Sequence, residues 1–88
     1  MVRRRLVIHG RVQGVFFRDT LRTLAERNGV AGWARNTPEG TVEAVLEGDE
    51  DAVARLGAFA RKGPEGALVE LVDEHTEEPQ GLSGFSIR

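Results

Sequence analysis

The chain has 88 residues, room for one domain over 1–88, with an ordinary apolar content and a formal net charge of −2. It has no cysteine and only two histidines, His9 and His75, which excludes disulfides and cysteine nucleophiles and disfavours a structural metal site. No apolar run approaches a membrane span or a signal-peptide core, so the sequence predicts a soluble, cytoplasmic protein without a membrane partner.

The first third of the chain predicts a strand, a loop and a helix. Residues 3–9 form a short apolar run with β-branched side chains, which is typical of a strand. Residues 10–14 interrupt this run with two glycines. Apolar side chains then recur at helical spacing from Phe17 to Ala25, and Gly29 follows as a typical helix stop.

The rest of the chain extends this order. Strands are expected at 30–35 and 41–47, and residues 36–40 between them have the Asn, Pro and Gly content of a hairpin link. Asp49 suits the N-cap of a second helix, which ends near Gly63. Strands follow at 67–77 and 85–87. The order βαββαβ plus a short strand predicts an α+β, ferredoxin-like sandwich, an antiparallel sheet with two helices on one face.

Charge is unevenly distributed along the chain. Residues 1–35 carry eight arginines against Asp19 and Glu26, about +6, and the remainder is correspondingly acidic. A basic first half suits a small anionic ligand, and it also suits a nucleic acid. Basic and acidic strands that interleave in one sheet would produce the same pattern without a ligand, so the charges alone leave these alternatives open.

The stretch from His9 to Arg18 joins the first strand to the first helix. Gly10 and Gly14 permit a tight turn and a close approach of a ligand to the backbone. Amides in such a turn, next to a helix N-terminus, can bind an anion, and the guanidinium of Arg18 matches two phosphate oxygens. The stretch is neither a Walker A loop nor a dinucleotide fingerprint. A purely structural turn, with Arg18 a solvated helix residue, also fits.

Asn36 lies at the end of a predicted strand, at the mouth of the hairpin. Its amide has two donors and an acceptor, so it can hold a water molecule in a fixed direction. Asparagine is also common in turns because it tolerates their geometry, and the local sequence alone does not assign it a role.

Taken together, the two stretches resemble the signatures of the acylphosphatase family. Residues 10–18 match Gly-x-Val-Gln-Gly-Val-x-Phe-Arg at every fixed position. Residues 32–43 match Gly-x-Val-x-Asn-x-x-x-Gly-x-Val-Glu, except that Ala34 replaces the usual valine at an expected core position. The length and the order of elements also fit the family, whereas the residues after Glu47 resemble it only in pattern.

The resemblance implies a hydrolase of acyl phosphates that needs no metal ion or other cofactor. A monomer is the simplest expectation, with the oligomeric state left open by the sequence, and no nucleic-acid partner is expected. Arg18 takes the position of the family's phosphate-binding arginine and Asn36 that of its water-orienting asparagine. Residues 11–18, called the cradle loop below, would hold the phosphate of the substrate, inorganic phosphate or another anion. Its residues are Arg11, Val12, Gln13, Gly14, Val15, Phe16, Phe17 and Arg18.

Two functions of other classes compete with a hydrolase on the residues alone. An RNA-binding module on the same fold would use the arginines and Phe16-Phe17, but the aromatic sheet motif of such modules is missing. A regulatory domain would bind an anion without turnover through the same loop and Arg18. Asn36 separates this domain from an enzyme, because a binder has no need to orient water. His9 is more typical of a surface or hydrogen-bonded residue than of a catalytic base.

Overall fold

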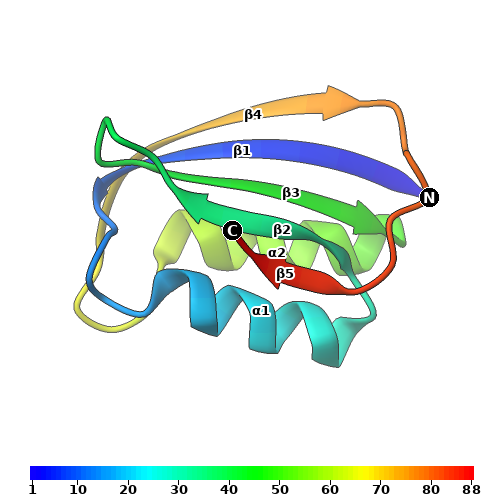
Figure 1. The fold of residues 1–88 in the computed structure, drawn as a ribbon, viewed down its shortest axis with the longest axis horizontal. Helices are drawn as coiled ribbons and strands as arrows, with labels where there is room; N and C mark the ends of the chain where they lie inside the picture. The colour runs from blue at the N-terminus through cyan, green and yellow to red at the C-terminus, as the bar shows by residue number, and fades with distance from the viewer.

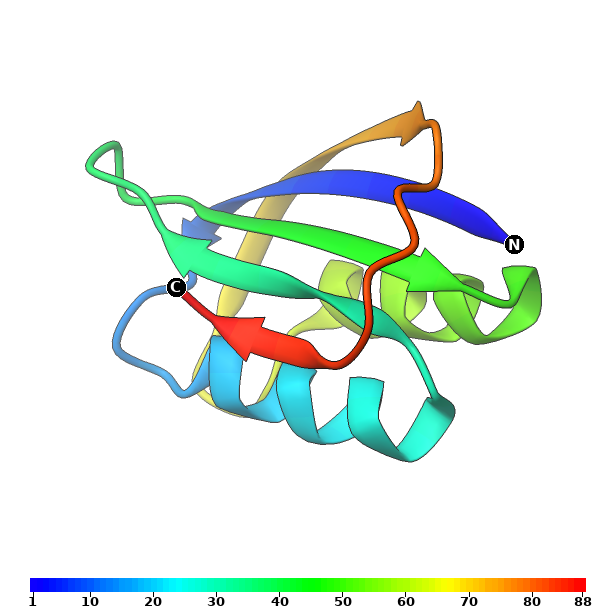
Figure 2. The same ribbon diagram turned by 45° about the vertical axis from the view of Figure 1, so that its right-hand side comes forward.

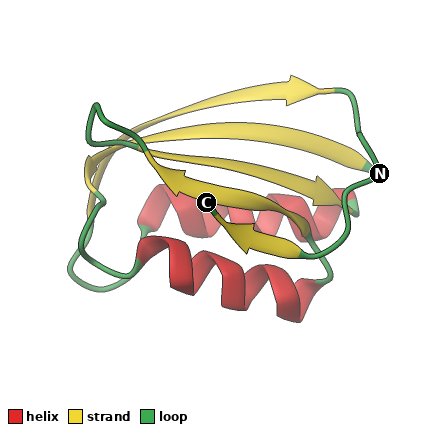
Figure 3. Cartoon of the chain, viewed as in Figure 1, coloured by secondary structure: helices red, strands yellow, loops and turns green.

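A computed structural model describes all 88 residues and shows a five-stranded sheet with two helices on one face (Figure 1). Figure 3 shows both helices beneath the sheet, with its opposite face left open. The predicted ferredoxin-like plan is confirmed. The elements follow in the order β1 (Val2–Arg11), α1 (Phe17–Asn28), β2 (Ala31–Asn36), β3 (Val42–Gly48), α2 (Glu50–Lys62), β4 (Leu68–Glu77) and β5 (Phe85–Ile87).

The strands lie in the order β4-β1-β3-β2-β5. The four long strands are antiparallel, as predicted, but β5 pairs parallel with β2, so the sheet is mixed. Figure 2 shows the reason, because residues 78–84 cross one end of the sheet from β4 to the opposite edge. The chain therefore enters β5 at the end where it left β4, and β5 must run opposite to β4, in the direction of β2.

β1 extends beyond the predicted strand, through Gly10 and Arg11, which were expected to begin the loop. The register between β1 and β4 shifts at His9/Gly10. Gly10 has a φ of 128°, and a Cβ at this position would lie 2.1 Å from the carbonyl oxygen of Leu68. The glycine therefore permits a bulge within a continuing strand and does not mark the end of that strand.

The core lies between the sheet and the helices, with α1 against β2 and β5 and α2 mainly against β1 and β4. The rings of Phe17 and Phe59 join the two helices, with centroids 5.8 Å apart. Asp49 caps α2, as predicted, by accepting hydrogen bonds from the amides of Asp51 and Ala52. Ala34 is completely buried in this core. Neither helix has the length and apolar content that a membrane span requires.

The open face of the sheet carries a chain of ion pairs across four strands. Its six side chains alternate in charge, in the order Arg35, Glu43, Arg5, Glu77, Arg3 and Glu47. Basic β1 lies between acidic β3 and β4, so the interleaving that the sequence left open accounts for these arginines. A linked network of this kind is more stabilising than isolated surface pairs.

Glu47 ends this chain and is only 1% exposed. Its carboxylate accepts hydrogen bonds from Arg3 and from the amides of residues 80–82, which belong to the segment leading to β5. Burial by itself would raise the pKa of Glu47. Hydrogen bonds from the amides of Gln80 and Leu82, from Arg3 and from the amide of Gly81 outweigh this effect and lower the pKa from 4.5 to about 2. The ionised Glu47 therefore holds the segment that leads to the last strand against the sheet.

We expect acid to weaken the fold through Glu47. Because its folded-state pKa is depressed, its stabilising effect is complete well above the ordinary value of 4.5 and is lost as the pH falls from there towards 2. Glu47→Gln should lower the free energy of unfolding by about 1–3 kcal/mol at pH 7. It should also reduce the loss of stability between pH 5 and pH 2. Thermal unfolding followed by circular dichroism measures both effects. The exposed Glu65→Gln is the control, and a wild-type acid slope in Glu47→Gln would contradict this assignment.

Candidate active site

The cradle loop connects the end of β1 to the start of α1 (Figure 1). Gly14 has a φ of 76° and open space on its Cβ side, so the turn depends on glycine at this point. No amide of residues 12–16 donates to a backbone acceptor, and no side chain accepts from them. Free amides at the start of a helix are donors available to an anion.

Arg18 lies in the first turn of α1 and is half-buried. Its guanidinium forms no ion pair or hydrogen bond, since the adjacent Asp19 faces Arg22 at 3.5 Å. Five of the eight arginines in residues 1–35 have acidic partners, whereas Arg11, Arg18 and Arg27 have none. Arg18 therefore remains a free cation in a partly desolvated position, where its charge is weakly screened.

Asn36 is the last residue of β2 and pairs with Val42 of β3. The residue is half-buried, and its side-chain amide has no hydrogen-bond partner within the protein. None of its polar atoms is a buried unsatisfied group, so the amide is accessible from solvent. It can therefore accept from, or donate to, a bound water or ligand.

One cavity of about 240 Å³ brings these groups together. Arg18 and Asn36, which come from different segments, both line it, so the two predicted side chains share one site. The predicted cradle residues Arg11, Gln13 and Val15 do not line it, whereas Asp19 does and was not predicted. Adjacency to Arg18 was the only sequence signal for Asp19. The lining residues are Val12, Gly14, Phe16, Phe17, Arg18, Asp19 and Asn36.

The side chain of Gln13, a predicted phosphate-binding residue, forms hydrogen bonds within the protein. Its Nε2 donates to the carbonyl oxygens of Thr37 at 2.9 Å and Thr41 at 3.0 Å, so it is turned towards the β2–β3 hairpin. The hydroxyls of these two threonines are 2.6 Å apart, and the amide of Thr37 donates to the carbonyl of Thr41. Gln13 thus fixes the cradle loop to the hairpin that carries Asn36. No spacing rule in the sequence indicated this contact.

Neither histidine belongs to the site. His9 Nε2 lies 3.0 Å from Asp73 Oδ2, as expected of a hydrogen-bonded surface residue, and His75 lies on the edge strand β4. The structure brings no group of three or more histidine or carboxylate side chains into metal-binding proximity.

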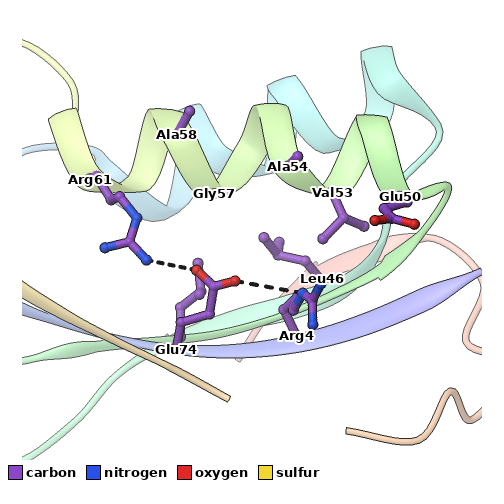
Figure 4. A pocket seen from close by; sticks show the side chains of 10 residues that line it. Arg4, Leu46, Glu50, Val53, Ala54, Gly57, Ala58, Arg61 and Glu74 are labelled. Atoms are coloured by element: carbon purple, nitrogen blue, oxygen red, sulfur yellow. Dashed lines mark hydrogen bonds and ion pairs between the residues drawn. The ribbon is translucent and has the colours of Figure 1, made fainter. Parts of the chain in front are cut away.

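A second cavity of about 310 Å³ lies between α2 and the sheet. Glu74 accepts a hydrogen bond from Arg61 at 2.8 Å and lies 3.6 Å from Arg4, as the dashed lines in Figure 4 show. Both arginines of this cavity therefore already have an acidic partner. No residue of the two signature stretches lines it. Of these two cavities, only the smaller one is lined by an arginine without an acidic partner.

Comparisons with known proteins show which family the chain belongs to. The acylphosphatase family model matches residues 4–87. An acylphosphatase of Thermococcus kodakarensis is 51% identical over 86 residues, 98% of this chain and 94% of its own. An acylphosphatase of Pyrobaculum arsenaticum is 55% identical over 82 residues, which cover 92% of this chain and 86% of its own. The crystal structure of acylphosphatase from Bacillus subtilis superposes with a TM-score of 0.96 at 31% identity, covering 100% of this chain and 99% of its own. The chain belongs to the acylphosphatase family.

Proposed function

We propose that the protein is an acylphosphatase that hydrolyses acyl phosphates, R–CO–O–PO₃²⁻, to a carboxylate and inorganic phosphate. Membership of the family supports this activity. One structural observation carries the mechanism: the arginine that lines the cavity has no acidic partner and shares that cavity with the free amide of Asn36. Positive charge for a phosphate and a group that orients water are thus available at one site.

Arg18 and the cradle loop bind the phosphoryl group. The planar guanidinium binds two of its oxygens, and the free amides of Val12, Gly14 and Phe16, which line the cavity, donate to oxygens of the same group. These donors are fixed by the turn and the helix before substrate arrives, so little reorganisation accompanies the transition state. Arg18 supplies positive charge and the amides supply hydrogen bonds to the phosphoryl oxygens, and the scheme assigns no step to a metal ion or other cofactor.

Asn36 orients the attacking water. Its amide accepts one hydrogen bond from the water and leaves an oxygen lone pair directed at phosphorus, in line with the bond to the acyl oxygen. The new P–O bond forms as the bond to the acyl oxygen breaks, and the carboxylate leaves with the bonding electrons. A carboxylate is a weak base, so no general acid is needed. One proton of the water passes to a phosphate oxygen, and dihydrogen phosphate is released.

Gln13 has a positioning role in this scheme. Arg18 and Asn36 belong to different segments and share no hydrogen bond, so the geometry between them depends on contacts that join their segments. The two bonds from Gln13 to the hairpin are such contacts. A monomeric state and a cytoplasmic location stay predictions from the sequence.

Removing Arg18 should abolish most of the activity. With EDTA present, we expect Arg18→Ala to lower kcat for acetyl phosphate by about 10³–10⁵-fold, the range for an arginine that stabilises phosphoryl transfer. Arg18→Lys should recover only part of it, because an ammonium lacks the planar fork. Arg27→Ala is the control, since Arg27 is an unpaired arginine on the same helix but far from the cavity. Activity in Arg18→Ala equal to that in Arg27→Ala would disprove the role.

Asn36→Ala should separate turnover from binding. We expect kcat to fall about 100-fold or more, the scale of one lost transition-state hydrogen bond, while KM and inhibition by inorganic phosphate change little. Steady-state kinetics with phosphate as competitive inhibitor measures both quantities. Asn28→Ala, at the distant end of α1, is the control. If Asn36→Ala weakened phosphate inhibition and kcat in parallel, Asn36 would be a binding group and would not orient water.

Gln13→Glu should disturb the geometry of the site with a near-isosteric change. The new carboxylate would face two carbonyl oxygens and repel the hairpin, so we expect kcat to fall about 10–100-fold from misplacement of Asn36. Far-ultraviolet circular dichroism should show an intact fold. Gln80→Glu is the control, because the side chain of Gln80 forms no hydrogen bond. Wild-type kcat in Gln13→Glu would exclude the positioning role.

A further inference from the structure

Phe16 has an unusually exposed side chain beside the candidate active site. Its side chain is 76% exposed, whereas the adjacent Phe17 is 2% exposed and packs in the core. The other large exposed apolar residues do not line the cavity: Met1 begins the chain, and Leu68 and Leu71 lie on edge strand β4, where Leu68 pairs with Arg11. Phe16 is also the only one of these four that lines the cavity with Arg18 and Asn36.

The backbone of Phe16 has a conformation that disfavours its own side chain. With φ at 60° and ψ at 29° it is left-handed, and every other residue with a positive φ in the chain is a glycine. A Cβ is unfavourable in this region, and glycine or asparagine is the usual solution. Because the ring is exposed, packing does not compensate for this strain. The fold itself therefore gives no reason for phenylalanine at this position.

The backbone of Phe16 is nevertheless held in place. The carbonyl of Phe16 accepts from the amide of Thr20 at 3.0 Å and from its hydroxyl at 2.8 Å, and these bonds hold Phe16 at the start of α1. The next residue, Phe17, is fixed by the core. The exposed ring therefore belongs to an ordered part of the loop, at the rim of the cavity.

The two ends of an acyl phosphate need different surroundings. Arg18, the free amides and Asn36 suit the charged phosphoryl end, which leaves the R–CO– group at the mouth of the cavity. We propose that the ring of Phe16 contacts this acyl group and gives the enzyme a preference for aromatic and long-chain acyl phosphates over acetyl phosphate. This inference rests on the proposed function, and it adds a residue that selects the acyl part of the substrate.

The test compares kcat/KM for benzoyl phosphate and acetyl phosphate, which carry the same phosphoryl group. Phe16→Gly and Phe16→Asn both suit a left-handed backbone and both remove the ring. We expect each to lower the benzoyl-to-acetyl ratio of kcat/KM by about 10-fold, the effect of one aromatic contact. Phe16→Trp should keep or raise the ratio, and Leu71→Ser, which removes another exposed apolar side chain, should leave it unchanged. Thermal unfolding should show no loss of stability in Phe16→Gly and Phe16→Asn.

A benzoyl-to-acetyl ratio within twofold of wild type in both Phe16→Gly and Phe16→Asn would overturn the proposal. So would an equal fall for the two substrates, because the ring would then act on the loop or on phosphate binding. These results would leave the proposed function intact if acetyl phosphate were still hydrolysed by the wild type and lost in Arg18→Ala. Different measurements would therefore disprove the acyl contact and the catalytic mechanism.

Discussion

Two hydrogen bonds of Gln13, together with the packing of α1 against β2, connect the segments that carry Arg18 and Asn36. They join the loop after β1 to the hairpin after β2, and Arg18 and Asn36 lie on these two segments without touching each other through any hydrogen bond. Both donors of the Gln13 amide are used, so its orientation is fixed. The paired threonines give the hairpin its own internal structure, and the glutamine therefore positions one ordered unit against another.

The electrostatics of the site follow from how the arginines are distributed. Three arginines on the open face of the sheet are neutralised by glutamates of neighbouring strands, and Arg4 and Arg61 share Glu74 on the helix-covered side. The uneven charge of the chain is thus largely cancelled between adjacent strands. Arg18 differs because no acidic strand lies beside it. An arginine without an acidic partner, free amides and a helix N-terminus coincide at one end of the sheet, and there we propose that the anion binds.

The sequence was sufficient for the order of the elements, because apolar spacing from Phe17 to Ala25 and the Asp49 cap are local signals. The direction of β5 was not predictable, since three residues carry no periodicity and the path of the preceding segment is a tertiary property. Gly10 was assigned to the loop because a bulge and a strand end have the same local signal. The two signature stretches identified Arg18 and Asn36, but the direction of the Gln13 side chain depends on a hairpin about 24 residues away.

The site combines features that each weaken a small domain: free amides, an unpaired half-buried cation and a left-handed phenylalanine. Their cost is tolerable because they lie in one loop, while the core and the ion-pair chain stabilise the rest of the sheet. Asp19 is subject to two opposing requirements, one from the helix and one from the site. An acidic residue in the first turn interacts favourably with the helix dipole, yet an ion pair with Arg18 would neutralise the charge that the proposed phosphate binding requires. In the structure the Asp19 carboxylate lies 3.5 Å from Arg22, one turn further along α1, and Arg18 has no acidic partner.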